Sequence, residues 1–433
     1  MKISRAKNKP LGKIELIAIA LGGMIGGGIF SILGISVEMV GGATPIAIFL
    51  GGLLAFCAAY SYSKLATYYK DEGATYSFFK KTFPNHTYAI AAIGWLIVFG
   101  YISTLALYAF TFASYTSSFF ADKPPGLIQY IAFSIIVLFG GINLLSVTGM
   151  GRVEDFMVYT KVLILAVISG LFLFKGNEPH TFSNLYADFS LSGVITVAAI
   201  TFVAYEGFQL VIHAYEEVSN PEKNVPSSIY WAIASATLIY VVLSLAAIHT
   251  IPEEFIIRDK EFALAAGASN ILGPWGYGVV ILGALLATSS AINGTIFGAS
   301  RLMAVIAKDG VFPPFLAKRS KGHIPHFSVV AMCALSYLFI LTGGLRMIVE
   351  FGSITFIVVS FLMAYANFHI RDKTKSHIVL TVLAMILLGI AALLIFAYEA
   401  HADPKQLAYI VGLYVLLSVL AKIYSVKVQP FES

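Results

Sequence analysis

The chain has 433 residues, of which 58% are hydrophobic and only 12% are charged, and its mean hydropathy is +0.84. A soluble globular protein carries about 25% charged residues, so this composition excludes an ordinary soluble protein and favours a chain surrounded by lipid. The net charge of +5 does not indicate a nucleic-acid partner, because the basic residues lie in short clusters between apolar segments. The two cysteines, Cys57 and Cys333, do not have a metal-binding spacing.

The sequence contains twelve apolar stretches that are close to the length of about 20 residues that a helix needs to cross a bilayer. We therefore predict an all-α integral membrane protein with twelve transmembrane helices. The first apolar stretch is too long and too rich in glycine for a removable signal peptide, so we expect it to be a membrane helix. The predicted helices cover residues 14–40, 45–69, 88–119, 128–147, 153–174, 192–215, 229–250, 277–306, 327–342, 348–368, 378–397 and 407–424.

Basic residues are unevenly distributed between the two sides that twelve helices would create. One side receives 21 of the 28 Lys and Arg residues and the other receives six, while Lys161 falls within a predicted helix. Cytoplasmic loops of membrane proteins are enriched in Lys and Arg. We therefore expect a multi-pass protein of the cell membrane with both termini in the cytoplasm.

Glycines are concentrated in the first predicted helix, at Gly22, Gly23, Gly26, Gly27 and Gly28. This pattern has two interpretations: the helix unwinds near the middle of the membrane, or the glycines allow close packing between helices. A packing motif places its glycines on one face, whereas three consecutive glycines point in different directions around a helix. The pattern therefore favours unwinding.

The sixth predicted helix has a carboxylate and a glycine near its middle. Glu206 and Gly207 stand within the sequence FVAYEGFQ, where a continuous lipid-facing helix would have neither. Helices one and six would be the first members of two five-helix halves, and interrupted helices at corresponding positions indicate a transporter binding site. The expected units are a first repeat at residues 1–175, a second repeat at 190–370, and helices 11 and 12 at 378–433.

Broken helices offer backbone groups to a ligand that carries both a positive and a negative charge. The N–H groups of Gly26, Gly27 and Gly28 would face a carboxylate, and carbonyls such as those of Met24 and Ala204 would accept hydrogen bonds from an ammonium group. An α-amino acid is the simplest ligand with both charges at this spacing. The residues expected to bind it are Met24, Ile25, Gly26, Gly27, Gly28, Phe202, Val203, Ala204, Tyr205, Glu206 and Gly207.

Several motifs resemble those of the amino acid-polyamine-organocation superfamily of secondary transporters. The first helix carries GGMIGGGIF at residues 22–30, which is similar to the family motif G-x-x-I-G-x-G-I-F. The next loop carries EGATY at 72–76, which resembles the G-G-x-Y element. Residues 205–226 include YEGFQ and AYEEVSNPEKNVP, and residues 290–310 include SAING, GASR and AKDG, which resemble the sixth-helix and eighth-helix signatures.

The resemblance covers most of the chain and implies the LeuT-type fold, in which ten core helices form two inverted repeats and two helices are added. It also implies amino acid transport by alternating access. The chain departs from the family pattern at Glu206, where a small residue is common, and at Gln209, where Glu is frequent. At Val203 some relatives have an aromatic gating residue, so that gate is absent here or is supplied by another residue such as Phe202.

Lys161 lies about 12 Å along the fifth predicted helix from its start. Its side chain could snorkel to the interface, but the depth exceeds its reach. Desolvation favours the uncharged amine, so a buried lysine can gain and lose a proton. By resemblance to proton-coupled relatives, the amine would replace a sodium ion near the carbonyls of Gly22 or Gly23 and near Ser289 or Ser290. We expect the proton as coupling ion and no metal or other cofactor.

Glu206 has three possible roles: a structural carboxyl that braces a broken helix, a partner for a cationic or polar substrate group, or a second proton carrier. Tyr101, Tyr108 and Tyr159 are candidates for the wall of a cavity, although aromatic residues are frequent throughout the chain and each could simply pack. The groups at the cytoplasmic end of helix six that could form an inner gate or anchor the interface are His213, Glu216 and Glu217.

Other functions fit the same composition. Within transport, the alternatives are an amino acid or amine exchanger and a carrier of polyamines or inorganic cations, because one fold can serve several substrates. An integral membrane enzyme is a more distant alternative, since the sequence has no H-E-x-x-H, P-loop or G-x-S-x-G motif. We expect a small amino acid and the lipid bilayer as partners, with no nucleic acid and no obligate protein partner.

Overall fold

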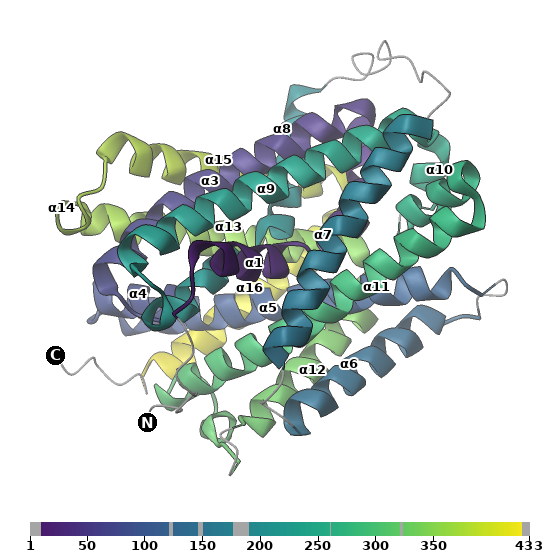
Figure 1. The fold of residues 1–433 in the computed structure, drawn as a ribbon. Coiled ribbons are helices and arrows are strands. Elements are labelled where there is room, and N and C mark those ends of the chain that lie inside the picture. The colour runs from purple at the N-terminus through teal and green to yellow at the C-terminus, as the bar shows by residue number, and fades with distance from the viewer. Residues whose placement is uncertain are drawn as a thin grey trace.

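The computed structural model describes residues 10–120, 124–145, 150–175, 190–259, 261–320 and 324–426. Within these residues the regular elements are all helices, apart from one isolated bridge between Leu11 and Val218 (Figure 1). Ten helical segments are long and apolar enough to cross a membrane. The prediction of an all-helical membrane protein is therefore confirmed.

The helices follow the predicted apolar segments in order along the chain. The first four predicted segments contain α1 (Lys13–Met24), α2 (Gly28–Val40), η1 (Gly41–Ala43), α3 (Thr44–Tyr69), α4 (Ala74–Thr82), α5 (Thr87–Ser117) and α6 (Leu127–Leu145), with α4 in the connection after α3. They are followed by α7 (Met150–Lys175), α8 (Leu191–Ile200), η3 (Thr201–Tyr205), η4 (Phe208–Glu217), α9 (Pro221–Thr250), α10 (Glu253–Arg258) and α11 (Ala263–Lys308). The last elements are η5 (Pro314–Ala317), α12 (His326–Thr342), α13 (Leu345–His369), α14 (Arg371–Thr374), α15 (Ile378–Ala402) and α16 (Pro404–Ser425).

The structure fixes the order of the spans more directly than it fixes their number. The segment Gly28–Tyr69 is helical throughout and joins α2 to α3, while α1 and α12 have 12 and 17 residues and are shorter than a full span. Twelve spans in two inverted repeats therefore stay a prediction. The eighth predicted segment, 277–306, is part of a longer helix, because α11 continues through a kink at Gly273, where φ is +66° and Pro274 follows.

Both predicted interruptions are present. Helix α1 ends at Met24 and α2 begins at Gly28, so three residues separate the two halves of the first span. In the sixth span, α8 leads into two 3₁₀ segments, η3 and η4, which are separated by Glu206 and Gly207. The glycine cluster and the mid-span carboxylate were therefore correct indicators of broken helices.

The broken helices are largely buried, whereas the last two helices expose most of their apolar surface. Within their most apolar windows, α5 and α13 are 83% buried, whereas α15 and α16 are 28% and 17% buried. Helix α5 contacts α6, α11, α12, α13 and α16, and α3 packs along α9. Helices α5 and α13 thus form the inner wall against which the site is built.

A buried polar cluster attaches the outer helices to α13. Arg346 of α13 donates from Nε to Glu350 at 2.8 Å and from its terminal nitrogen to Glu399 of α15 at 2.6 Å. Both carboxyl side chains are 0% exposed, and the amide of Gln406 at the start of α16 hydrogen-bonds both of them. The cluster offsets the cost of burying two carboxylates by giving them shared donors.

One end of the bundle gathers the first and last described elements, and we call it the terminal face. Helix α4 contacts η4 there and leads into the start of α5, while α11 and α16 end there. The contacts that define the terminal face are the hydrogen bond of Leu11 to Glu217, the ion pair of Lys80 with Asp309, and the contact of Lys422 with the ring of Tyr88.

Candidate functional site

The two helix breaks touch through their backbones. Gly207 has φ +125°, a conformation that residues with a side chain rarely adopt. A methyl group at Gly207 would lie 2.5 Å from the carbonyl carbon of Gly23, and one at Gly23 would lie 3.1 Å from the Cα of Gly207. Only glycine allows this approach, which places the first break directly against the second.

A buried tyrosine joins the same two breaks by hydrogen bonds. The hydroxyl of Tyr240 on α9, 0% exposed, lies 2.8 Å from the carbonyl oxygen of Met24 and 3.1 Å from that of Ala204. The N–H of Gly26 also donates to Met24, at 2.9 Å. These carbonyls and this N–H therefore have partners inside the protein, as buried backbone groups require, and their contact with a ligand stays a prediction.

The other glycines of the first break fit both interpretations of the sequence pattern, which are unwinding of the helix and close packing between helices. A methyl group at Gly26 would lie 2.5 Å from the ring of Tyr108, and one at Gly27 would lie 2.8 Å from a side chain of α5. Gly28 faces η3, where a methyl group would lie 3.1 Å from Ala204. The segment is unwound, and its glycines also allow close packing in several directions.

Lys161 points to the first break from α7. Its side chain is 0% exposed, and Nζ donates to the carbonyl of Gly22 at 2.8 Å. Helix α7 lies close to α1 here, since a methyl group at Gly22 would lie 3.0 Å from Val158. The predicted proximity of Lys161 to Gly22 is confirmed, and an inward-pointing, hydrogen-bonded amine excludes snorkelling.

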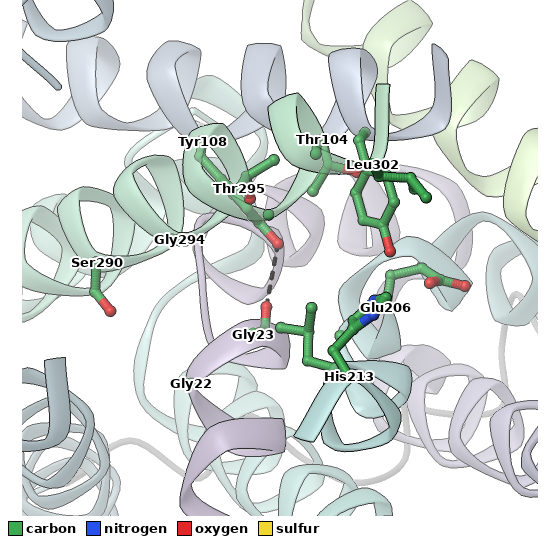
Figure 2. A pocket seen from close by; sticks show the side chains of 16 residues that line it. Gly22, Gly23, Thr104, Tyr108, Glu206, His213, Ser290, Gly294, Thr295 and Leu302 are labelled. Atoms are coloured by element: carbon green, nitrogen blue, oxygen red, sulfur yellow. Dashed lines mark hydrogen bonds between the residues drawn. The ribbon is translucent and has the colours of Figure 1, made fainter. Parts of the chain in front are cut away.

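A cavity of about 60 Å³ lies beside the breaks (Figure 2). It is enclosed by α1, α5, the sixth span and α11. The hydroxyl of Tyr108 donates across it to the carbonyl of Gly23 at 3.2 Å. The lining residues are Gly22, Gly23, Tyr101, Thr104, Tyr108, Glu206, Gly207, Leu210, His213, Ser290, Ala291, Gly294, Thr295, Gly298, Ala299 and Leu302.

The structure separates the predicted site residues into two groups. Gly22, Gly23, Glu206, Gly207 and Ser290 line the cavity. The remaining predicted residues are not among its lining, and most are buried around the breaks. They are Met24, Ile25, Gly26, Gly27, Gly28, Phe202, Val203, Ala204, Tyr205, Lys161 and Ser289.

Sequence reasoning predicted Ser290 on α11 but missed the rest of the cavity wall that this helix forms. Small residues at Ser290, Gly294 and Gly298 recur every four positions on one face of α11 and continue the lining to Leu302. This spacing is a helical stripe of small side chains, a signal that the sequence did contain. Tyr101 and Tyr108 do line the cavity, whereas Tyr159 is 55% exposed on α7 and does not.

The cavity leads towards the terminal face. Its lining follows α11 from Ser290 to Leu302, about 18 Å along the helix, in the direction of Lys308. In the opposite direction from the break, Phe30 and Tyr115 are fully buried and pack edge to face at 5.6 Å. The cavity is therefore less obstructed towards the terminal face than towards the opposite end of the bundle.

Glu206 lines the cavity and also braces the second break. Its carboxylate accepts a hydrogen bond from the side chain of Gln209, whose own carbonyl oxygen accepts from the N–H of Gly207 at 3.2 Å. The side chain is 3% exposed. Among the described residues, no Lys, Arg or His forms an ion pair with Glu206, and no group of three His, Cys, Asp or Glu side chains could hold a metal ion.

The loop between α3 and α4 contacts His213 at the mouth of the cavity, the end of the lining nearest the terminal face. His213 Nδ1 lies 2.7 Å from the carbonyl oxygen of Glu72, and the N–H of Glu216 donates to the Glu72 carboxylate at 3.4 Å. Burial, together with the nearby carboxylates of Glu216 and Glu217, raises the pKa of Glu72 above its ordinary value despite this hydrogen bond. The groups predicted for an inner gate thus lie at the mouth, with Glu72 as a partner that the sequence did not reveal.

Asp71, next in the same loop, fixes the start of α4. Burial acts to raise the pKa of its carboxyl, but the ammonium of Lys81, the hydroxyl of Ser77 and the N–H of Gly73 together hold the pKa below its ordinary value. A carboxylate with three donors is strongly favoured in its charged form. This ion pair holds the loop that carries Glu72 in place.

Comparisons with known proteins cover the whole site. The model of the amino acid permease family matches residues 11–418. The chain is 31% identical over 398 residues to an uncharacterized protein of Methanocaldococcus jannaschii, covering 90% of this chain and 89% of the relative. It is 27% identical over 426 residues to the inner membrane transport protein YbaT of Escherichia coli, covering 96% of each. It is 25% identical over 340 residues to the branched-chain amino acid permease BcaP of Bacillus subtilis, covering 74% and 71%. With both breaks and the cavity inside the matched region, the chain belongs to the amino acid permease family.

Proposed function

We propose that the chain is a secondary active transporter that imports amino acids by alternating access, with protons as the coupling ions and Lys161 as the proton carrier. Membership of the amino acid permease family supports the substrate class. The observation that carries proton coupling is the hydrogen bond of 2.8 Å from the buried Nζ of Lys161 to the carbonyl of Gly22.

The position of this hydrogen bond links the protonation state of Lys161 to the two breaks. Protonated Lys161 is a charged donor to Gly22, and a charge-assisted hydrogen bond in a low-dielectric interior is stronger than a neutral one. Loss of the proton weakens the tie between α7 and α1. Gly22 precedes Gly23, which lies against Gly207, so a change at Lys161 acts on both breaks.

The proposal includes twelve spans in two inverted repeats, at residues 1–175 and 190–370, with helices 11 and 12 at residues 378–433 and both termini in the cytoplasm of a cell-membrane protein. The distribution of basic residues, 21 on one side against six on the other, supports this orientation. The terminal face is then cytoplasmic, and the cavity that leads to it corresponds to an inward-facing state.

Uptake into liposomes tests the coupling. Purified protein with Lys161→Ala should lose accumulation driven by an imposed pH gradient but retain counterflow of a preloaded amino acid, because the substrate cavity is intact. The matched control is Lys373→Ala, an exposed lysine on α14. Full gradient-driven accumulation by Lys161→Ala would disprove proton coupling through this residue. Uptake that always requires internal amino acid would identify an exchanger instead.

A second candidate is transport of cationic amines, including polyamines. It is favoured by Glu206, a carboxylate that lines the cavity without an ion pair from the described residues. Glu206→Gln keeps the size of the side chain and removes its charge. A loss of competition confined to lysine, arginine and polyamines would indicate direct recognition, and an equal loss for all amino acids would indicate that Glu206 only braces the break.

A further inference from the structure

A second, larger hollow lies on the outside of the bundle, apart from the substrate cavity. It is a groove of about 670 Å³ between α16, α13 and α5, with one side chain from α15. Its α16 wall includes Val411, Val415 and Val419, which are 42%, 57% and 50% exposed, and α13 contributes Ile354 and Val358. The groove is therefore apolar and open to the surroundings of the protein.

The length of the groove fits one leaflet of a bilayer. From Val411 to Lys422 the lining follows α16 for about 16 Å, which is roughly half of the 30 Å hydrocarbon core. At the terminal face the groove ends at Lys422, whose Nζ lies 5.9 Å from the ring centroid of Tyr88. Lysine and tyrosine together are typical of the headgroup level of a membrane.

A polar contact occurs along the groove on the side towards the membrane centre. The hydroxyl of Tyr414 lies 2.7 Å from Oγ1 of Thr355, and the ring of Tyr414 stacks on Phe351 with centroids 5.2 Å apart. Helices α13 and α16 are thus joined above the groove. What remains is an apolar slot with a single described cation at its interfacial end.

We propose that this groove binds an anionic phospholipid, with an acyl chain along α16 and the phosphate against Lys422. The apolar walls match an acyl chain, and the ammonium complements a phosphate at the depth where headgroups lie. A zwitterionic lipid would fill the walls equally well but would bring no net charge to Lys422. This inference depends on insertion of the chain in a membrane and not on proton coupling.

The proposed lipid lies next to the part of α13 that holds the second break in place. Ile354 in the groove follows Ser353, whose hydroxyl donates to the carbonyl of Ile200 and accepts from the N–H of Val203 at 3.4 Å. An occupied groove packs against the helix that holds η3. Lipid binding therefore stabilises the part of α13 that contacts the site.

Native mass spectrometry of the full chain, delipidated and then mixed with phosphatidylglycerol and phosphatidylcholine, tests the proposal. The wild type should retain phosphatidylglycerol preferentially, and Lys422→Gln should reduce that preference about fivefold, the effect of one basic residue at a membrane surface. The matched control is Lys373→Gln, an exposed lysine outside the groove, which should leave the preference unchanged. An unchanged preference in Lys422→Gln would overturn the proposal.

A second variant tests the apolar part of the groove. Val415→Trp fills the slot from a lipid-exposed position, so it should fold and should retain less of both lipids. Full lipid retention by this variant would show that the groove is not the site. If Val415→Trp instead converted a dimer into a monomer with lipid retention unchanged, the groove would be a contact between two copies, and the lipid proposal would fail.

Discussion

The hydroxyl of Tyr240 offers the sharpest test of how the two broken helices are held together. Tyr240→Phe removes one oxygen atom and keeps the ring, which packs at 5.4 Å from Tyr205 in a fully buried position. The change removes the single hydroxyl hydrogen that the carbonyls of Met24 and Ala204 share. No other contact of the side chain needs to change.

The expected loss in the free energy of unfolding depends on which hydrogen-bond donors each carbonyl retains. Met24 retains the N–H of Gly26, so it loses one hydrogen bond, worth about 1 kcal/mol. Ala204 loses the donor that the structure gives it, and an unsatisfied buried carbonyl costs about 1–3 kcal/mol. Because a single hydrogen serves both carbonyls, the two losses do not add in full, and the free energy of unfolding should fall by about 2–3 kcal/mol. Substrate affinity should fall too, because the relative position of the breaks is less constrained.

A matched substitution separates this effect from the general loss of a buried hydroxyl. Tyr115 is also 0% exposed and donates to the carbonyl of Phe30 at 3.2 Å, but Phe30 lies inside α2, where the helix supplies a second donor. Tyr115→Phe should cost only about 1 kcal/mol. Unfolding in mixed detergent micelles and ligand-induced thermal shifts measure both variants. Equal destabilisation by the two substitutions, with unchanged ligand affinity, would refute the bridging role of Tyr240.

Three further predictions follow from other parts of the structure. Gly207→Ala should destabilise the protein by about 3 kcal/mol or more and abolish uptake, whereas Gly412→Ala, with open space around it, should do neither. Asp71→Asn should lower thermal stability at pH 7. Folding lowers the pKa of the Asp71 carboxyl below its ordinary value of 3.8, so the charged form contributes stability at every pH above 3.8. The difference in melting temperature between wild type and variant should therefore shrink only when the pH falls below that value. Arg346→Gln should cost about 3–5 kcal/mol in detergent unfolding, since it leaves two buried carboxylates without their cation; a loss below 1 kcal/mol would contradict this.

The sequence predicted the elements well because each signal was strong and local. Apolar length located the membrane helices, and the glycine cluster and Glu206 located the two breaks. The depth of Lys161 correctly indicated a buried amine, while its nearness to Gly22 was implied by the family resemblance. These features depend on a residue and its neighbours in the chain, which a pattern can show.

The contacts that the sequence did not reveal join residues far apart in the chain. The carbonyls of Met24 and Ala204 were expected to be free for a ligand, and the structure adds Tyr240, on another helix, as a hydrogen-bond partner of both. The loop contact of Glu72 with His213 joins positions 141 residues apart. No local pattern reveals such partners, since the packing of whole helices decides which side chain reaches which backbone group.

Internal pairing at the breaks changes which groups are left to recognise a substrate. With the Met24 and Ala204 carbonyls already paired, ligand contacts shift towards side chains in the cavity wall. The buried hydroxyl of Ser290 has no hydrogen-bond partner among the described residues, which makes it a candidate for this role. No atom lies within 4 Å of the position that a methyl group at Gly298 would occupy, so a larger residue at this position of α11 would narrow the cavity. We therefore infer that the breaks supply rigidity and close backbone contact, and that α11 and Glu206, which line the cavity, supply the side chains that distinguish one small molecule from another.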